Sequence, residues 1–240
     1  MNELVEFTMR FIQHPELALP ILNLDDSAAD SKKSLRHGCN LPDTVRAIIC
    51  GPSGCGKTNA MLTLIYHPNG LRFENVYVYS KSLYQPKYEQ LGKVLKQSGS
   101  GLRYFPFSDN ESVIDPSEAR ENSLMIFDDV ACDKQNNIKA YFSMGRHKHI
   151  DSFYLCQTYT CIPKHLVRDN ANVLILFKQD ELNLRHCYDD HVTTDMSFNT
   201  FKELCAECWK DSKYDMLVIV KDNDLSQGRY RKNFDKYVHL

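Results

Sequence analysis

One short segment constrains the fold of this chain more than any other: residues 48–62 read IICGPSGCGKTNAML. An apolar run, which predicts a buried strand, leads into a glycine-rich loop, and the loop leads into a run with helical spacing. Gly51, Gly56, Lys57 and Thr58 fit the pattern G-x-x-x-x-G-K-[ST] in the strand–loop–helix context that this pattern requires. The segment therefore predicts a phosphate-binding loop (P-loop) in an α/β domain.

Each part of this loop has a physical reason to contact phosphate. Glycines lack a Cβ atom, so backbone N–H groups can converge on phosphate oxygens, and the helix amino terminus adds partial positive charge. We expect Lys57 to contact the β- and γ-phosphates and the Thr58 hydroxyl to bind Mg²⁺. Cys55 lies near the helix amino terminus, which would lower its thiol pKa, and we expect bound nucleotide to protect it from a thiol reagent. The predicted nucleotide-binding residues are Gly51, Pro52, Ser53, Gly54, Cys55, Gly56, Lys57, Thr58 and Asn59.

The rest of the chain alternates strand-like and helix-like segments. Because several strand-like runs are apolar on both faces, we expect a mostly parallel sheet covered by helices. A short amphipathic helix (Leu4, Phe7, Phe11, Ile12) and a polar arm are expected in residues 1–43, and the P-loop domain with its carboxyl-terminal helices and strand in residues 44–240. The predicted strands are 44–50, 74–80, 102–108, 123–130, 150–157, 172–178 and 214–221. The predicted helices are 57–67, 86–97, 136–147, 163–170, 180–190 and 198–210.

Composition narrows the function classes. No apolar run approaches the roughly 20 residues of a membrane span, so we expect no membrane partner. The chain has nine cysteines, an odd and scattered set that indicates an intracellular protein without a disulfide framework. The formal net charge is −2, so any binding of nucleic acid must use local basic clusters.

A second segment, LMIFDDV, selects among P-loop proteins. Its apolar residues predict a buried strand that delivers Asp128 and Asp129 to the edge of the sheet where ligands bind. Asp128 is positioned to hold Mg²⁺ through water, as a Walker-B acid does, and Asp129 to orient or deprotonate the attacking water. The strand at 150–157 ends in Gln157, whose amide could contact the γ-phosphate and the water.

Together these motifs resemble the poxvirus-type genome-packaging ATPases, which belong to the FtsK–HerA branch of P-loop motors. The resemblance covers roughly residues 44–180 and also rests on FSMGRHKHIDSFYLCQTYTCIP and RDNANVLILF. It implies an ATP- and Mg²⁺-dependent motor that assembles as a ring and threads double-stranded viral DNA into a preformed capsid. It also implies an extra strand, here 150–157, between the P-loop strand and the Walker-B strand.

The resemblance assigns roles by motif position. Lys57 and Thr58 would bind nucleotide and Mg²⁺, Asp128 would be the Walker-B acid, Asp129 the catalytic acid and Gln157 the sensor. Arg146 would be an arginine finger for a neighbouring subunit, with Arg168 as the next candidate. The implied partners are further copies of the chain, duplex DNA of any sequence, and proteins of the capsid or portal vertex. The implied location is the host cell at the site of virion assembly, in cytoplasm or nucleus, or with the virion.

Several alternatives stay open. Asp129 occupies a position where most FtsK–HerA motors have Glu, so the placement of water could differ. About 60 residues follow position 180, too few for a nuclease domain, so we expect no DNA cleavage. A P-loop nucleotide kinase and an ATP-binding capsid-assembly or scaffold subunit without turnover are the alternative functions, and no N-K-x-D motif supports a GTPase. Cys205 and Cys208 form a C-x-x-C pair that would suit zinc, although two small residues on one helix face near Trp209 explain it better.

Overall fold

The computed structural model describes residues 36–97 and 101–238. The chain divides into two units, Met1–Ser34 and Leu35–Leu240. The predicted amino-terminal amphipathic helix lies outside the described residues. Residues 36–43, which the sequence pattern assigns to a polar arm, belong to the second unit.

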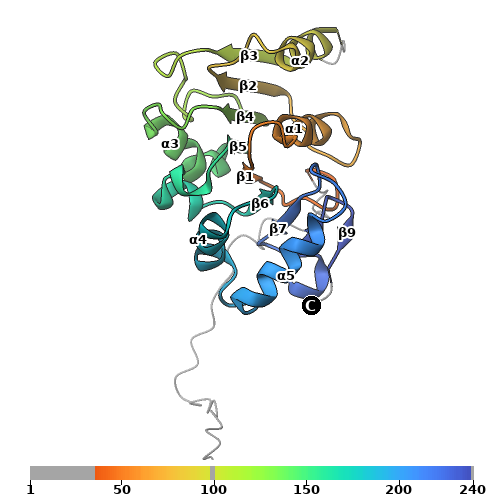
Figure 1. Ribbon diagram of the computed structural model, residues 1–240. Coiled ribbons are helices and arrows are strands. Elements are labelled where there is room, and N and C mark those ends of the chain that lie inside the picture. Colours follow the sequence, from red (N-terminus) through yellow and green to blue (C-terminus); the bar gives the residue numbers. More distant parts are fainter. Residues whose placement is uncertain (1–35, 98–100, 239–240) are drawn as a thin grey trace, which may run out of the picture. The chain divides into compact units, whose positions relative to one another are not determined.

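Within the described residues, nine strands form one sheet in the order β3-β2-β4-β5-β1-β6-β7-β8-β9. Neighbours from β3 to β6 run parallel, and β7, β8 and β9 join antiparallel. The predicted extra strand is confirmed, because β5 lies between β1 and β4, as the central part of Figure 1 shows. The strands are β1 Arg46–Cys50, β2 Asn75–Ser80, β3 Arg103–Phe107, β4 Ser123–Asp128, β5 Ile150–Cys156, β6 Val173–Leu176, β7 Leu217–Val220, β8 Tyr230–Lys232 and β9 Lys236–Tyr237.

Helices cover both faces of the sheet. The buried residues of α1 and α2 share one hydrophobic core with one face, and those of α3, α4 and α5 share a second core with the other face. Figure 1 shows α1 and α2 on the opposite side of the strands from α3 and α4. None of the helices among the described residues is long and apolar enough to cross a membrane. The helices are α1 Lys57–Tyr66, α2 Pro86–Gln97, α3 Asn136–Met144, α4 Glu181–His191 and α5 Phe198–Cys208.

Burial of the sheet on both faces explains the unbroken apolar runs of the sequence. In β1, Ile48 and Cys50 belong to one core, whereas Ala47 and Ile49 belong to the other. This is the alternation of side chains across a strand, with an apolar environment on each side. Both faces therefore favour apolar residues, and the run IIC reads as a strand although it shows no polar alternation.

Two segments differ from the sequence-based expectation. Residues 163–170 form no regular helix, because the turn Lys164–Arg168 is interrupted at His165 and at Leu166, whose φ is 70°. The basic segment at 228–237 contributes β8 and β9 to the sheet. The charged residues of this segment conceal the strand in the sequence. In the structure Arg231 is nevertheless buried, and its guanidinium donates to the carbonyl oxygens of Gly228 and Asn40, both at 2.7 Å.

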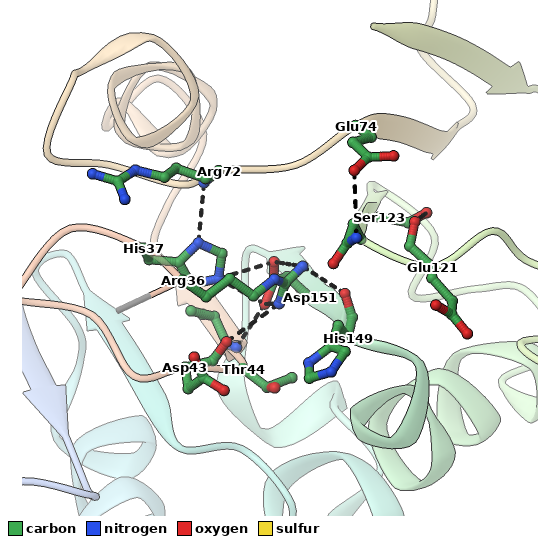
Figure 2. A network of polar contacts seen from close by, with 12 residues as sticks. Arg36, His37, Asp43, Thr44, Arg72, Glu74, Glu121, Ser123, His149 and Asp151 are labelled. Atoms are coloured by element: carbon green, nitrogen blue, oxygen red, sulfur yellow. Dashed lines mark hydrogen bonds and ion pairs between the residues drawn. The ribbon is translucent and has the colours of Figure 1, made fainter. Parts of the chain in front are cut away.

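A polar network ties residues 36–45 to the amino-terminal ends of the strands (Figure 2). The buried carboxylate of Asp151 accepts from the Val45 N–H at 2.8 Å and from the Arg36 guanidinium at 3.1 Å. His37 Nε2 lies 3.1 Å from the same carboxylate, and its Nδ1 accepts from the Arg72 N–H at 3.0 Å. These contacts hold the segment before β1 at the sheet edge opposite the P-loop.

Candidate nucleotide-binding site

The carboxyl ends of the parallel strands bring the predicted site residues to one edge of the sheet. The β-ladder pairs Cys50 with Cys156, and Asp128 with Leu155 and Ser80, so β1, β5, β4 and β2 all end there. A cavity of about 540 Å³ opens at this edge. Its lining residues are Ser53, Gly54, Gly56, Lys57, Thr58, Asn59, Gln85, Lys87, Asp128, Asp129, Ala131, Cys132, Leu155, Cys156, Gln157, Thr158, Cys161 and Tyr214.

The P-loop takes a backbone path that its glycines permit. Gly54 and Gly56 have φ values of 74° and 107°, in the left-handed region that favours glycine, and Gly56 caps the amino terminus of α1. Gly51 is required for packing, because a Cβ atom there would lie 2.6 Å from Phe177 and 2.7 Å from the Cys55 sulfur. The Lys57 ammonium donates to the carbonyl oxygens of Gly51 at 2.7 Å and Pro52 at 3.0 Å, so the loop holds the cation at the cavity.

Cys55 differs from the sequence-based expectation. Its side chain is buried beneath the loop, and it does not line the cavity although its neighbours on both sides do. Burial raises the pKa of the Cys55 thiol above its usual value, and the opposing effect of the Lys57 charge is smaller. The expected lowering by the helix amino terminus is therefore wrong, because removal from water outweighs the helix field.

Asp128 enters the cavity from the last position of β4 and is itself largely buried. Burial raises the pKa of its carboxyl group, while a hydrogen bond from the Tyr88 hydroxyl and the charge of Lys57 oppose that rise. Tyr88 comes from α2, is 3% exposed, and donates to Asp128 Oδ2. The tyrosine thus fixes the orientation of a carboxylate that lies within the electrostatic reach of the P-loop lysine.

Asp129 follows Asp128 but leaves the core. Its side chain is exposed at the cavity, and its φ of 59° lies in the left-handed region, which Asp tolerates better than most residues other than glycine. This backbone turn allows consecutive residues to reach the same cavity, one carboxylate buried beside Tyr88 and the other open. An open carboxylate at this edge can accept a proton from water, which is the role that we predict for it.

Gln157 lies directly after β5 and reaches the cavity as an exposed side chain. A buried network anchors the loop that carries it. The Tyr159 hydroxyl donates to Asp190 Oδ2 at 3.1 Å and lies 2.7 Å from His191 Nε2. Arg168 binds the same Asp190 oxygen at 2.6 Å and lies over the Tyr159 ring at 5.1 Å.

The two predicted arginine fingers occupy different environments. Arg168 is 9% exposed and forms an ion pair with Asp190, so its guanidinium is not free. Arg146 is exposed in the turn Gly145–Lys148. That turn precedes β5, so Arg146 lies at the amino-terminal edge of the sheet, opposite the cavity, and cannot reach the cavity of the same chain.

Thr58 and Asp128 provide a hydroxyl and a carboxylate in the same cavity, which are hard oxygen ligands suited to Mg²⁺. Among the described residues, no cluster of three or more His, Cys, Asp or Glu side chains is arranged to hold a metal ion. Mg²⁺ commonly binds through few protein ligands, phosphate oxygens and water, so these two residues fit it. Cys205 and Cys208 are buried in the core beneath α5, and burial raises the pKa of Cys208 to about 11.

Three features of the cavity do not follow from the motifs. Gln85 and Lys87 line the cavity and Tyr88 contacts Asp128 from beneath it; all three come from α2 and the turn before it, which follow β2. The exposed thiols of Cys132 and Cys161 line the cavity, as does the exposed ring of Tyr214. The pairing of β2 with β4 is the signal that could have located the first group, since it places the residues after β2 beside Asp128.

Comparison with known families gives one match over most of the chain. A family described as Poxvirus A32 protein matches residues 33–237. Comparison with curated protein sequences gives no match.

Solved structures with the same fold include the genome packaging NTPase B204 of Sulfolobus turreted icosahedral virus 2 bound to sulfate. The two sequences are 14% identical, the match covers 80% of this chain and 97% of the B204 chain, and the TM-score is 0.54. The DNA-packaging ATPase B204 of Sulfolobus turreted icosahedral virus is 15% identical, with 82% and 99% of the two chains covered and a TM-score of 0.52. The structure of the B204 protein of Sulfolobus turreted icosahedral virus 2 with AMPPCP also matches. The sequence identity is 12%, the match covers 80% of this chain and 98% of that chain, and the TM-score is 0.51. At such identities the likeness concerns the fold, a P-loop NTPase sheet.

Proposed function

The chain belongs to the Poxvirus A32 protein family, and from this premise we propose that it is an ATP-hydrolysing motor that packages double-stranded viral DNA into a preformed capsid. Its fold is also that of solved structures described as viral genome-packaging NTPases. We propose ATP as the nucleotide and Mg²⁺ as its metal ion, and the host cell at the site of virion assembly as the place of action.

One observation carries the proposal: the P-loop, the two acids of β4 and the amide after β5 line a single cavity. A phosphate-binding loop alone would suit many P-loop proteins. An exposed carboxylate and an exposed amide beside it supply what hydrolysis adds, namely groups that hold and deprotonate a water molecule. A capsid-assembly subunit that only binds nucleotide has no need of Asp129 and Gln157 at this position.

Each residue has a part in the proposed reaction. The backbone N–H groups of residues 53–58 and the Lys57 ammonium bind the phosphate oxygens and offset the charge that develops on the γ-phosphate. Thr58 and Asp128 would hold Mg²⁺, which supplies further positive charge to the phosphates when bound. Asp129 accepts the proton of the attacking water, and the Gln157 amide orients that water and distinguishes ATP from ADP.

The ring and the arginine finger are part of the proposal. An arginine that stabilises the transition state contributes on the order of 10³- to 10⁵-fold in rate. Arg146 is exposed and far from its own site, so it is available to the site of a neighbouring subunit in a head-to-tail ring. Arg168 is less suited because Asp190 engages it.

A mixing experiment tests this assignment. Arg146→Ala and Lys57→Ala should each be nearly inactive alone. In a one-to-one mixture, about a quarter of random interfaces pair an intact P-loop with an intact Arg146, and activity should reappear. A mixture that forms mixed rings yet stays inactive argues against action in trans, and a fully active Arg146→Ala variant excludes this residue as the finger.

The proposed DNA contacts are to phosphates, since a motor must accept any sequence. Steady-state ATP hydrolysis, measured with and without duplex DNA over a salt titration, tests the function. We expect DNA to raise the rate, and salt to remove the rise steeply because phosphate contacts release counterions. Hydrolysis without any response to DNA at low salt would favour a different role, and phosphate transfer to a nucleotide acceptor would identify a kinase.

A further inference from the structure

Tyr214 occupies an unusual position at the nucleotide cavity. It is 55% exposed, although tyrosine rings in this protein are more often buried, and it is the one aromatic side chain among the described residues that line the cavity. It lies beside the P-loop: a Cβ atom added to Gly56 would be 3.3 Å from Tyr214 Cδ1. An exposed ring thus lies next to the glycine that caps the amino terminus of α1, where the phosphate-binding loop ends.

A network of hydrogen bonds holds the backbone on which this ring is mounted. The Tyr214 N–H donates to the Ser212 hydroxyl at 3.2 Å, and the Ser212 N–H donates to Asp215 Oδ2 at 3.1 Å. Asp215 Oδ1 in turn accepts from the Asn233 amide at 3.2 Å, which connects the turn to the segment after β8. The backbone that carries the ring is therefore held in place before a ligand binds, and the exposed ring is open to one.

The position suits the base of a nucleotide. With the phosphates at the backbone N–H groups of residues 53–58, the nucleoside must extend away from Lys57 and out of the polar part of the cavity. The other lining residues are mostly small or polar, so they offer little surface to a flat heterocycle. An aromatic ring offers such a surface, because every nucleobase has a π-face that stacks on it.

We propose that the Tyr214 ring is the stacking surface for the nucleobase of the bound nucleotide. This inference rests on the proposed nucleotide-binding function. Stacking is tolerant of base identity, so Tyr214 supplies affinity for the nucleoside part and little discrimination between adenine and guanine. The Lys213 ammonium lies over the ring, 4.9 Å from its centroid, so one face already makes a cation–π contact and the opposite face is the one left for the base.

Binding measurements with three ligands separate the base from the phosphates. Calorimetric titration with Mg·ATP, Mg·GTP and Mg·tripolyphosphate would be made on the wild type and on Tyr214→Ala, Tyr214→Phe and Tyr66→Ala. Tyr66 is the matched control, since it is 45% exposed but lies at the far end of α1. Tyr214→Ala should weaken ATP and GTP about 5- to 100-fold and leave tripolyphosphate unchanged, whereas Tyr214→Phe and Tyr66→Ala should bind all three like the wild type.

Several results would overturn the inference. ATP affinity unchanged in Tyr214→Ala would show that the base lies elsewhere. An equal loss in Tyr214→Phe would show that the hydroxyl, and not the ring, makes the contact. A loss of tripolyphosphate binding in Tyr214→Ala would mean that the ring supports the P-loop and does not stack on the base. Failure of the wild type to bind either ATP or tripolyphosphate would refute the nucleotide site itself, and with it the proposed function.

Discussion

We predict that this protein loses stability in mild acid because of a buried histidine, His191, which contacts Tyr159 in the loop after Gln157. His191 is 7% exposed. Because the Tyr159 hydroxyl gives its proton to Asp190, the neutral imidazole donates from Nε2 to the tyrosine oxygen. Its Nδ1 then carries no proton, and no partner for it lies among the described residues. Protonation at Nδ1 would create a buried cation whose new N–H has no acceptor among the described residues.

Burial, together with the nearby charge of Lys221, lowers the pKa of His191 to about 3, whereas an unfolded histidine has a pKa of about 6.5. The folded pKa lies below the unfolded pKa, so the unfolded chain binds more protons between these values. Stability is therefore fully present above pH 6.5 and is lost as the pH falls toward 3. Integration of this difference gives a loss of about 2 kcal/mol between pH 8 and pH 5.

Urea unfolding measures this loss, with the fluorescence of Trp209, the single tryptophan, as the signal. The variant His191→Gln keeps a donor for Tyr159 but cannot titrate, so its stability should change by about 2 kcal/mol less than that of the wild type over the same pH range. His165→Gln is the control, since the His165 side chain is 89% exposed. Equal pH dependence in the wild type and His191→Gln would refute the reasoning.

Two further perturbations address the cavity. Tyr88→Phe removes the hydrogen bond to Asp128 and keeps the ring. The Mg²⁺ concentration for half-maximal hydrolysis should rise about tenfold, since hydrogen bonds to charged groups contribute about 1.5–3 kcal/mol. An unchanged Mg²⁺ titration contradicts this prediction. Cys132 and Cys161 are exposed in the cavity, so both should react with a small thiol reagent more slowly in the presence of Mg·ATP, while the buried Cys55 stays unlabelled. Mass spectrometry of the labelled peptides checks this, and rapid labelling of Cys55 would contradict the burial.

The sheet was largely predictable from sequence because its physical signal is local. A strand buried on both faces is mostly apolar, and the segments at β1, β2, β4, β5 and β6 contain such runs. The P-loop was predictable because its glycines meet backbone requirements that few other residues meet. The position of the extra strand came from the family resemblance, since the order of strands in a sheet is not written in any one of them.

The structural features that the sequence did not predict depend on contacts between segments that are distant in the chain. Tyr88 has the spacing of a core residue of α2, and only the pairing of β2 with β4 brings its hydroxyl to Asp128. Arg231 reads as a surface charge, but carbonyl oxygens far apart in the sequence allow its burial in β8. Tyr214 lies about 160 residues after the P-loop, and only the fold places its ring beside Gly56.

Movement along duplex DNA is the central claim, and a triplex-displacement assay measures it most directly. A labelled third strand is annealed to one end of a duplex, and its ATP-dependent release is followed over time. The wild type should release the strand with Mg·ATP and not with a non-hydrolysable analogue. Asp129→Asn should bind ATP as the wild type does but release no strand, since a general base contributes about 10²- to 10⁴-fold in rate. Active ATP hydrolysis by the wild type without strand release, or release by Asp129→Asn at the wild-type rate, would contradict the account.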